Sequence, residues 1–106
     1  MPDTWVTDLR HYLTEEGYLA DLPTPTLNLA LFVGSIVAWV TGHRPSDTPR
    51  TNVYCRRSPG RRRCPGEIQA VLDESSARIV WECPICGDNG VISGWEGTEW
   101  ERRSGA

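Results

Sequence analysis

The stretch "ARIVWECPICGDNGVISGW", residues 77–95, places a Cys-Pro-Ile-Cys-Gly segment between two short runs of strand-forming residues. A Cys-x-x-Cys segment lets two thiolates, here Cys83 and Cys86, meet one metal ion. Pro84 stiffens the turn between them, and Gly87 is free to adopt a positive φ. The segment therefore predicts a metal-binding knuckle that joins two strands.

Outward from this knuckle, the second half of the chain is typical of short strands. The predicted strands are Thr51 to Tyr54, Glu67 to Leu72, Ala77 to Glu82 and Val91 to Trp95. The residues "DESSA" between the second and third runs are typical of a hairpin turn. This region is predicted to form a small antiparallel sheet.

A second cysteine pair, Cys55 and Cys64, lies at the ends of two of these runs. No secretory signal is recognised at the start of the sequence, so we expect a reducing, cytoplasmic location, where clustered cysteines bind metal more often than they form disulfides. Zinc takes four tetrahedral ligands. The sequence therefore predicts one structural zinc site with the ligands Cys55, Cys64, Cys83 and Cys86.

These residues resemble a zinc ribbon, in which a three-stranded antiparallel sheet holds two metal-binding loops, and the knuckles also resemble those of rubredoxins. The resemblance covers about Val53 to Trp95. Cys83 and Cys86 match its second knuckle, and "CPGEI" after the first pair resembles a knuckle exit, with Gly66 serving the turn as Gly87 does. The first loop departs from the family, because eight residues separate its cysteines where two to four are usual.

Other uses of paired cysteines require different surrounding residues. A thioredoxin-type pair begins a helix, but "GDNG" follows Cys86. Zinc deaminases combine His-x-Glu with Pro-Cys-x-x-Cys, and neither histidine here begins such a motif. Thiolates alone do not exclude iron, so a rubredoxin-like electron carrier stays open. Four cysteine ligands leave zinc no open position, which predicts a protein that is not an enzyme.

The first cysteine loop, "CRRSPGRRRC" at residues 55–64, is rich in arginine. Its arginines are Arg56, Arg57, Arg61, Arg62 and Arg63. One interpretation is that they offset the negative charge of a zinc tetrathiolate. The other is that they bind an acidic protein surface or a nucleic acid, although the formal charge of −3 gives the whole chain no general attraction for nucleic acid. We expect an adaptor or protein-binding module, with a nucleic-acid-binding zinc ribbon as the alternative.

The first half of the chain is predicted to be helical. Apolar residues at Trp5, Leu9, Tyr12 and Leu13 recur at helical spacing between Asp3 and about Glu16. A second helix is expected from a Thr24 cap to about Thr41, with Gly42 ending it.

The second helix contains the apolar segment Leu27 to Val40. It is shorter than the roughly 20 residues of a membrane span and contains Asn28, Gly34 and Ser35, so we expect a buried helix and no membrane contact. Because it is apolar nearly all round, the sequence also predicts a homodimer through Leu27 to Val40, with Gly34 and Ser35 allowing close approach.

The predicted fold class is α+β: a two-helix N-terminal unit with a small antiparallel zinc-ribbon-like sheet. The predicted divisions are a helical unit at residues 1–44, a linker at 45–52, and the sheet with an acidic aromatic tail at 53–106. In the tail, Trp95 is expected to pack over the metal loops, and Trp100 to lie in more solvated surroundings.

Overall fold

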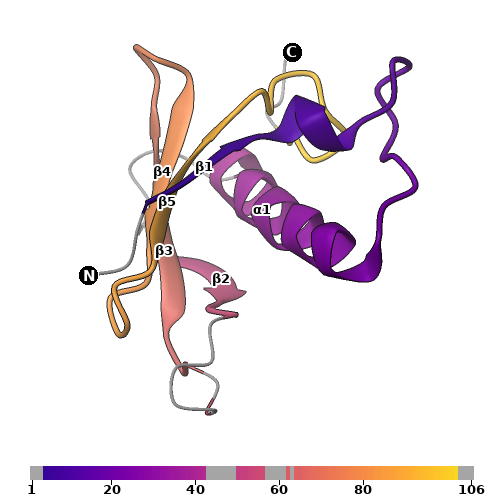
Figure 1. Cartoon of the computed structure of the whole chain (residues 1–106). Coiled ribbons are helices and arrows are strands. Elements are labelled where there is room, and N and C mark those ends of the chain that lie inside the picture. Colours follow the sequence, from indigo (N-terminus) through magenta and orange to yellow (C-terminus); the bar gives the residue numbers. More distant parts are fainter. Residues whose placement is uncertain (1–3, 43–49, 57–61, 63, 103–106) are drawn as a thin grey trace.

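The computed structural model describes residues 4–42, 50–56, 62 and 64–102. These residues form one α-helix, one short 3-10 helix and five strands (Figure 1). In chain order the elements are β1 (Thr4–Asp8), η1 (Leu9–Tyr12), α1 (Thr24–Gly42), β2 (Arg50–Tyr54), β3 (Glu67–Asp73), β4 (Arg78–Glu82) and β5 (Asn89–Ser93).

The five strands form a single mixed sheet in the order β1-β5-β4-β3-β2. Neighbours from β2 to β5 are antiparallel, whereas β1 pairs with β5 in parallel. The prediction of four strands after residue 50 is confirmed, with ends shifted by one or two residues. The predicted turn between β3 and β4 is also present, with the Asp73 carboxylate accepting hydrogen bonds from Ser75 and Ser76.

The predicted fold class, with a two-helix N-terminal unit and a small antiparallel sheet, is wrong. The segment expected to form the first helix is β1 followed by the single turn η1. Residues 4–7 are Thr-Trp-Val-Thr, a run of β-branched and aromatic side chains that favours extended backbone. Since β5 offers an edge to pair with, strand pairing outweighs the helical spacing of Trp5 and Leu9.

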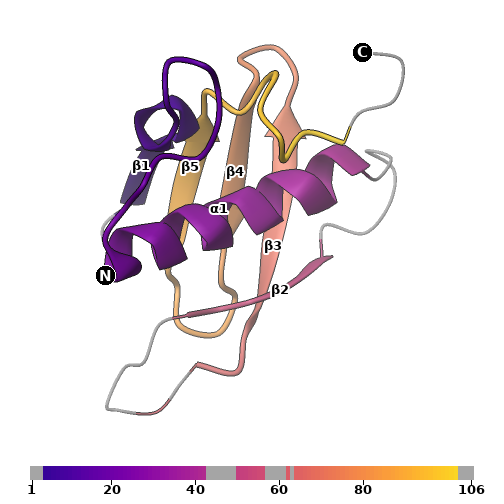
Figure 2. The same ribbon diagram turned by 90° about the vertical axis from the view of Figure 1, so that its right-hand side faces the viewer.

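The second predicted helix is confirmed as α1, which crosses one face of the sheet (Figure 2). Its buried face includes Val33, Ile36 and Val37, whereas Asn28 and Ser35 are exposed. By length and composition α1 also meets the criterion for a membrane-spanning helix, a criterion that core helices of soluble proteins meet as well.

The core lies between α1 and the inner face of the sheet, and Trp81 of β4 is at its centre. Register places Ala70 of β3 on one side of Trp81 and Gly90 of β5 on the other. A Cβ atom at position 90 would lie 2.5 Å from the Trp81 Nε1 atom, so glycine makes room for the indole. Phe32 of α1 meets the same indole edge-on, with ring centroids 5.6 Å apart. Small residues in the flanking strands thus let one large aromatic join helix and sheet.

The tail after β5 packs onto the body. Trp95 is fully buried, as expected. It does not pack over the metal loops, because its indole N–H donates a hydrogen bond to the Ala77 carbonyl at the β3–β4 turn, 2.8 Å away. The prediction that Trp100 is more solvated is wrong, because its side chain is buried against α1. A Cβ atom at Gly34 would lie 2.5 Å from the Trp100 indole. The close approach expected at Gly34 is therefore made by the chain's own tail.

Candidate metal centre

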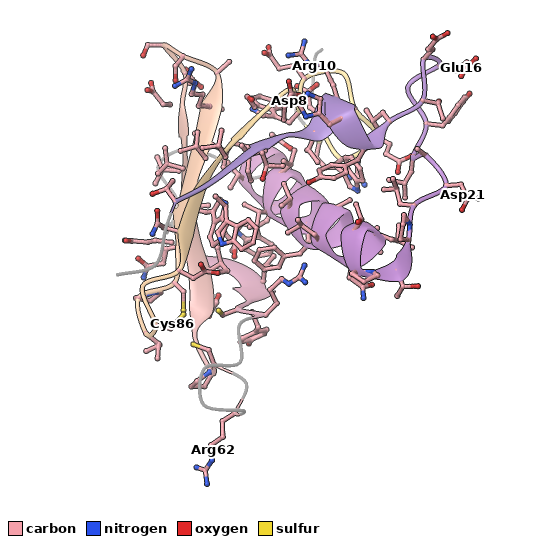
Figure 3. The ribbon with its side chains drawn as sticks, in the orientation of Figure 1. Asp8, Arg10, Glu16, Asp21, Arg62 and Cys86 are labelled. Atoms are coloured by element: carbon pink, nitrogen blue, oxygen red, sulfur yellow. The ribbon has the colours of Figure 1, made fainter. Side chains whose placement is uncertain are left out.

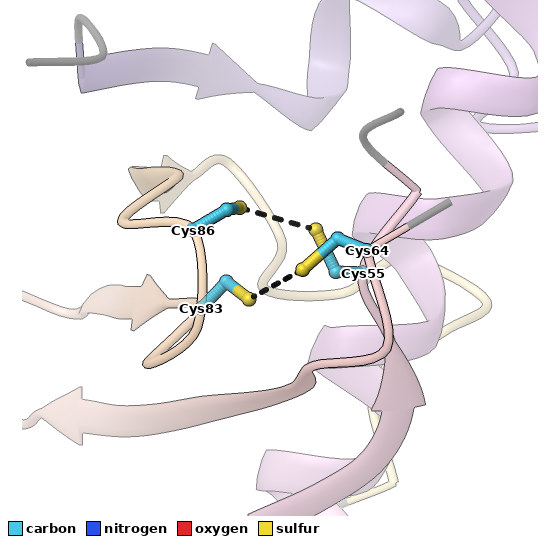
Figure 4. A group of neighbouring side chains, drawn as sticks. All are labelled: Cys55, Cys64, Cys83 and Cys86. Atoms are coloured by element: carbon cyan, nitrogen blue, oxygen red, sulfur yellow. Dashed lines mark hydrogen bonds between the residues drawn. The ribbon is translucent and has the colours of Figure 1, made fainter. Parts of the chain in front are cut away.

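Two loops at one end of the sheet bring the four cysteines together (Figure 4). Cys55 directly follows β2 and Cys64 precedes β3, while Cys83 follows β4 and Cys86 lies in the turn before β5. All four Sγ atoms lie within 4.8 Å of one another. The cysteines are therefore positioned to bind one metal ion, compatible with a zinc-knuckle-like site.

The sulfur spacing fits a metal centre and not a pair of disulfides. The Cys55 and Cys86 Sγ atoms are 3.7 Å apart, and the Cys64 and Cys83 Sγ atoms are 3.6 Å apart. A disulfide requires about 2.05 Å between sulfurs. Four sulfurs placed tetrahedrally at about 2.3 Å from an ion are about 3.8 Å from one another. Each short contact also joins one loop to the other, so a shared ion would connect the two loops.

Backbone hydrogen bonds hold each loop in shape. The Cys55 N–H donates to the Gly66 carbonyl at 2.8 Å, and the Cys83 N–H donates to the Asp88 carbonyl at 2.7 Å. The Gly87 N–H then donates to the Cys83 carbonyl at 2.9 Å, which closes the second turn. Gly87 has a φ of +82°, so the prediction of a positive φ at this residue is confirmed.

Gly66 has a different role from the one predicted. It is not among the glycines with positive φ. Its Cα faces the other loop instead, and a Cβ atom there would collide with the Cys83 sulfur and the Ile85 side chain. Its N–H donates to the Cys64 Sγ atom at 3.4 Å. Gly66 therefore lets the two loops come close together, a requirement that the cysteine spacing alone does not indicate.

Burial and hydrogen bonding act in opposite directions on the thiols. Burial raises the pKa of the Cys83 thiol, but the N–H groups of Cys86 and Ile85 and the Cys64 thiol outweigh burial and leave this pKa below its ordinary value. At Cys64, the Gly66 N–H lowers the pKa, but burial and the Cys83 and Cys86 sulfurs outweigh it and raise this pKa overall. A bound cation would favour the thiolate form at all four positions.

The structure places two of the five loop arginines. The Arg56 guanidinium carbon lies 5.9 Å from the centroid of the Phe32 ring, a cation–π contact that joins this end of the loop to α1. Arg62 is exposed and extends away from the body of the molecule (Figure 3). The other predicted binding residues, Arg57, Arg61 and Arg63, lie outside the described residues. Sequence reasoning did not find the contact with Phe32, because that residue is one of many apolar residues in α1.

Comparisons of the chain with protein-family models, with curated proteins and with solved structures find no match. The four cysteines and the surface around them are therefore the features of this chain that indicate its function.

Proposed function

We propose that this chain is a non-enzymatic, cytoplasmic zinc-binding protein with a structural zinc centre on Cys55, Cys64, Cys83 and Cys86. It acts as an adaptor, using the arginine loop at residues 56–63 to contact an acidic protein surface. The observation that carries the proposal is the set of four Sγ atoms within 4.8 Å of one another, contributed by two loops.

A structural role for zinc is supported by the burial of its ligands. Cys55, Cys64 and Cys83 are at most 5% exposed and belong to the same hydrophobic core as Ile68 and Trp81. Four sulfurs complete the tetrahedral coordination of zinc and leave no position for a reactive water. The ion would therefore organise the loops and would not carry out chemistry.

The surface beside the metal centre combines positive charge with exposed apolar side chains. Arg62 is exposed, Ile85 at the second knuckle is 64% exposed, and Tyr54 at the end of β2 is 56% exposed. Protein interfaces combine such apolar and aromatic contacts with arginine. Because the chain has a formal charge of −3, its positive charge is local, which favours a localised acidic protein site over a long nucleic acid.

The zinc centre is tested by elemental analysis and thiol counting on the full chain purified under reducing conditions. We expect one zinc per chain in the wild type and weaker retention in Cys86→Ser, with Ser35→Ala on the exposed face of α1 as the control. Stoichiometric iron and a red protein would support a rubredoxin-like electron carrier instead. A well-folded protein without stoichiometric metal would contradict the proposal.

The arginine loop is tested by fluorescence anisotropy with two probes, a labelled polyglutamate peptide and a labelled single-stranded oligonucleotide. Replacing Arg61, Arg62 and Arg63 by alanine should abolish binding to polyglutamate. A variant with alanine at Arg44, Arg102 and Arg103 loses the same charge outside the loop and should still bind. Tighter binding to the oligonucleotide, with a salt slope of roughly one unit per phosphate contact, would favour the nucleic-acid alternative.

A further inference from the structure

The outer face of the sheet, opposite α1, has a continuous row of valines across four strands. Register pairs Val6 with Val91, Val91 with Val80, and Val80 with Val71. Val6 is 83% exposed, Val71 59% and Val80 51%, and Val91 is partly exposed. Among the described residues, α1, η1 and the tail lie on the other side of the sheet (Figure 1). We name these four residues the valine row.

The valine row is more than a set of scattered surface residues. A water-facing side of an antiparallel sheet is normally polar, and a contiguous exposed apolar patch marks an interaction site. Polar residues border the row on both sides along the strands. They are Thr4, Asn89, Glu82 and Gln69 on one side, and Asp8, Ser93, Arg78 and Asp73 on the other. An apolar centre with a polar rim is the usual anatomy of a protein interface.

The charges on this face identify its occupant. Asp8 is paired with Arg10 at 3.1 Å, and the Asp73 carboxylate accepts hydrogen bonds from the β3–β4 turn. Arg78 and Glu82, which flank Val80 on β4, form no ion pair within the described part of the chain. With respect to residues 4–42, 50–56, 62 and 64–102, strand β4 therefore presents an unpaired cation, an apolar residue and an unpaired anion at alternate positions.

This order of charges is complementary to itself. Suppose that a second copy stacks face to face, related by a two-fold axis that lies between the two sheets and runs along the valine row. Strand β4 is then antiparallel to β4 of the other copy, and Arg78 of each copy meets Glu82 of the other. Val80 then lies on Val80 at the axis, and the two rows pack against each other. Stacked sheets pack about 10 Å apart, a gap that arginine and glutamate side chains can bridge. We propose that the valine row is the homodimer interface of this protein.

The face is small for an interface. Five residues along each strand and four strands across give about 17 by 19 Å, from the usual spacings of about 3.3 Å per residue and 4.8 Å per strand. This footprint of about 320 Å² is well below the roughly 800 Å² that each partner usually buries in a specific interface, so the interface belongs with the weak, transient ones. We therefore expect a monomer–dimer equilibrium that depends on protein concentration.

This interface differs from the one expected from sequence, through Leu27 to Val40. In that segment, Val33, Ile36 and Val37 already pack against the core, and Trp100 fills the space above Gly34. The proposal also stands apart from the metal centre, because none of its residues is a cysteine ligand. Its failure would leave the zinc and arginine proposals unchanged.

The test is sedimentation equilibrium of the metal-loaded full chain over a range of concentrations. Wild type should dimerise. Arg78→Glu or Glu82→Arg should raise the dimer dissociation constant by about tenfold or more, because each places like charges across the axis. The double variant R78E/E82R should dimerise again, since the swapped charges are still complementary. An equimolar mixture of the two single variants should form a heterodimer, because their faces then carry opposite charge.

Two further variants keep the test decisive. Val80→Thr has nearly the same shape and should weaken the dimer without unfolding the chain, which circular dichroism and metal content would verify for every variant. Leu31→Glu, at an exposed position of α1, should leave the dimer intact. A wild type that stays monomeric at all concentrations would overturn the proposal. So would a dimer that Leu31→Glu dissociates, or one that neither charge reversal nor Val80→Thr weakens.

Discussion

At residue 66 the chain has no room for a methyl group, because the Cys83 sulfur and the Ile85 side chain lie where a Cβ atom would be. Gly66→Ala should therefore push the two cysteine loops apart. Metal ligands tolerate little displacement, so we expect zinc binding to weaken at least tenfold, a loss of about 1.4 kcal/mol or more in binding free energy. Competition with a chromogenic chelator at neutral pH measures this affinity.

Gly42→Ala is the matched control for Gly66→Ala. Gly42 ends α1 away from the cysteines, and its nearest neighbour, the Arg102 Cβ atom, would lie 3.4 Å from an added methyl group. The control should bind zinc as the wild type does. Equal affinity in both variants would show that the loops can separate without loss of the site, contrary to the role assigned to Gly66.

Asp8, at the start of η1, makes a contribution to the stability of the fold that depends on pH. Its carboxylate accepts hydrogen bonds from the Arg10 N–H and guanidinium, and this hydrogen bonding to Arg10 holds the pKa of Asp8 below its ordinary value. A carboxyl group whose pKa is lower in the folded state stabilises the fold above its unfolded pKa of about 3.9 and loses this effect as pH falls through the folded pKa.

Asp8→Asn should therefore lower the free energy of unfolding at neutral pH by less than about 1 kcal/mol, because the Arg10 side chain of the pair is 71% exposed. The deficit should shrink below about pH 4. The difference in urea midpoint between variant and wild type at each pH measures this deficit, since the effects of the other acid-sensitive groups are the same in both proteins and cancel. A deficit that stays constant down to about pH 3 would mean that the carboxylate charge is not the cause.

Among single residues, the grouping of the four cysteines was predictable and the packing around them was not. The Cys-Pro-x-Cys-Gly pattern indicates both the knuckle and the positive φ of Gly87, because both follow from local chemistry. Cys55 and Cys64 were recognised by their position at strand ends. The role of Gly66 depends on side chains from the other loop, such as Ile85, which lies 19 residues later in the sequence. No local pattern contains that information.

Among the elements, α1 and the C-terminal tail depend on each other through Gly34 and Trp100. Gly34→Ala in the wild type should lower the free energy of unfolding by about 1–3 kcal/mol, since the new methyl group overlaps the indole. Trp100→Ala alone should cost about 3 kcal/mol by leaving a cavity. In the Trp100→Ala background, Gly34→Ala should instead stabilise by roughly 0.5–1 kcal/mol, because alanine is the better helix former.

This double-mutant cycle is measured by urea unfolding of the metal-loaded proteins. Ser35→Ala, one residue along on the exposed face of α1, is the control and should change stability by less than about 0.5 kcal/mol in either background. If Gly34→Ala were equally destabilising with and without Trp100, the tail would not be packed on α1 in solution.

The elements also show where sequence patterns mislead. β2 to β5 and α1 were predictable, because their hydrophobic patterns and turn residues agree with their final environment. β1 was not, since Trp5 and Leu9 have helical spacing while residues 4–7 favour extended backbone. Parallel pairing with β5, whose residues lie 85 positions later in the register, decides between the two. Only the assembled sheet supplies that edge.

Across the whole molecule, one core joins both ends of the sequence. Leu9 of η1 and Val33 and Ile36 of α1 pack with Ile79 and Ile92 of the sheet, and the same buried cluster includes three of the cysteines. The metal centre therefore lies at the edge of the core and not in a separate appendage. Loss of the metal should loosen the whole sheet, and unfolding of the metal-free chain should stay a single transition.

Metal removal and acid should act on stability through the same four sulfurs. At a free zinc concentration 1,000 times the dissociation constant, binding adds about 4.1 kcal/mol to the free energy of unfolding. Zinc bound at the proposed centre would hold the cysteines as thiolates, whereas unfolded thiols have a pKa of about 8.5, so it would lower the pKa of these thiols in the folded state. The zinc-dependent stability is therefore greatest above that pH and falls on acidification, as protons compete for sulfur.

Thermal unfolding of zinc-loaded and chelator-treated protein, in the presence of a phosphine reductant, tests this linkage across a pH series. We expect the two melting curves to lie far apart at neutral pH and above, and to converge at acid pH. Cys86→Ser, with three thiolates, should show a smaller separation at every pH, whereas Ser35→Ala should behave as the wild type does. Coincident curves for zinc-loaded and metal-free wild type at neutral pH would mean that the sheet and α1 hold the cysteine loops in place without an ion.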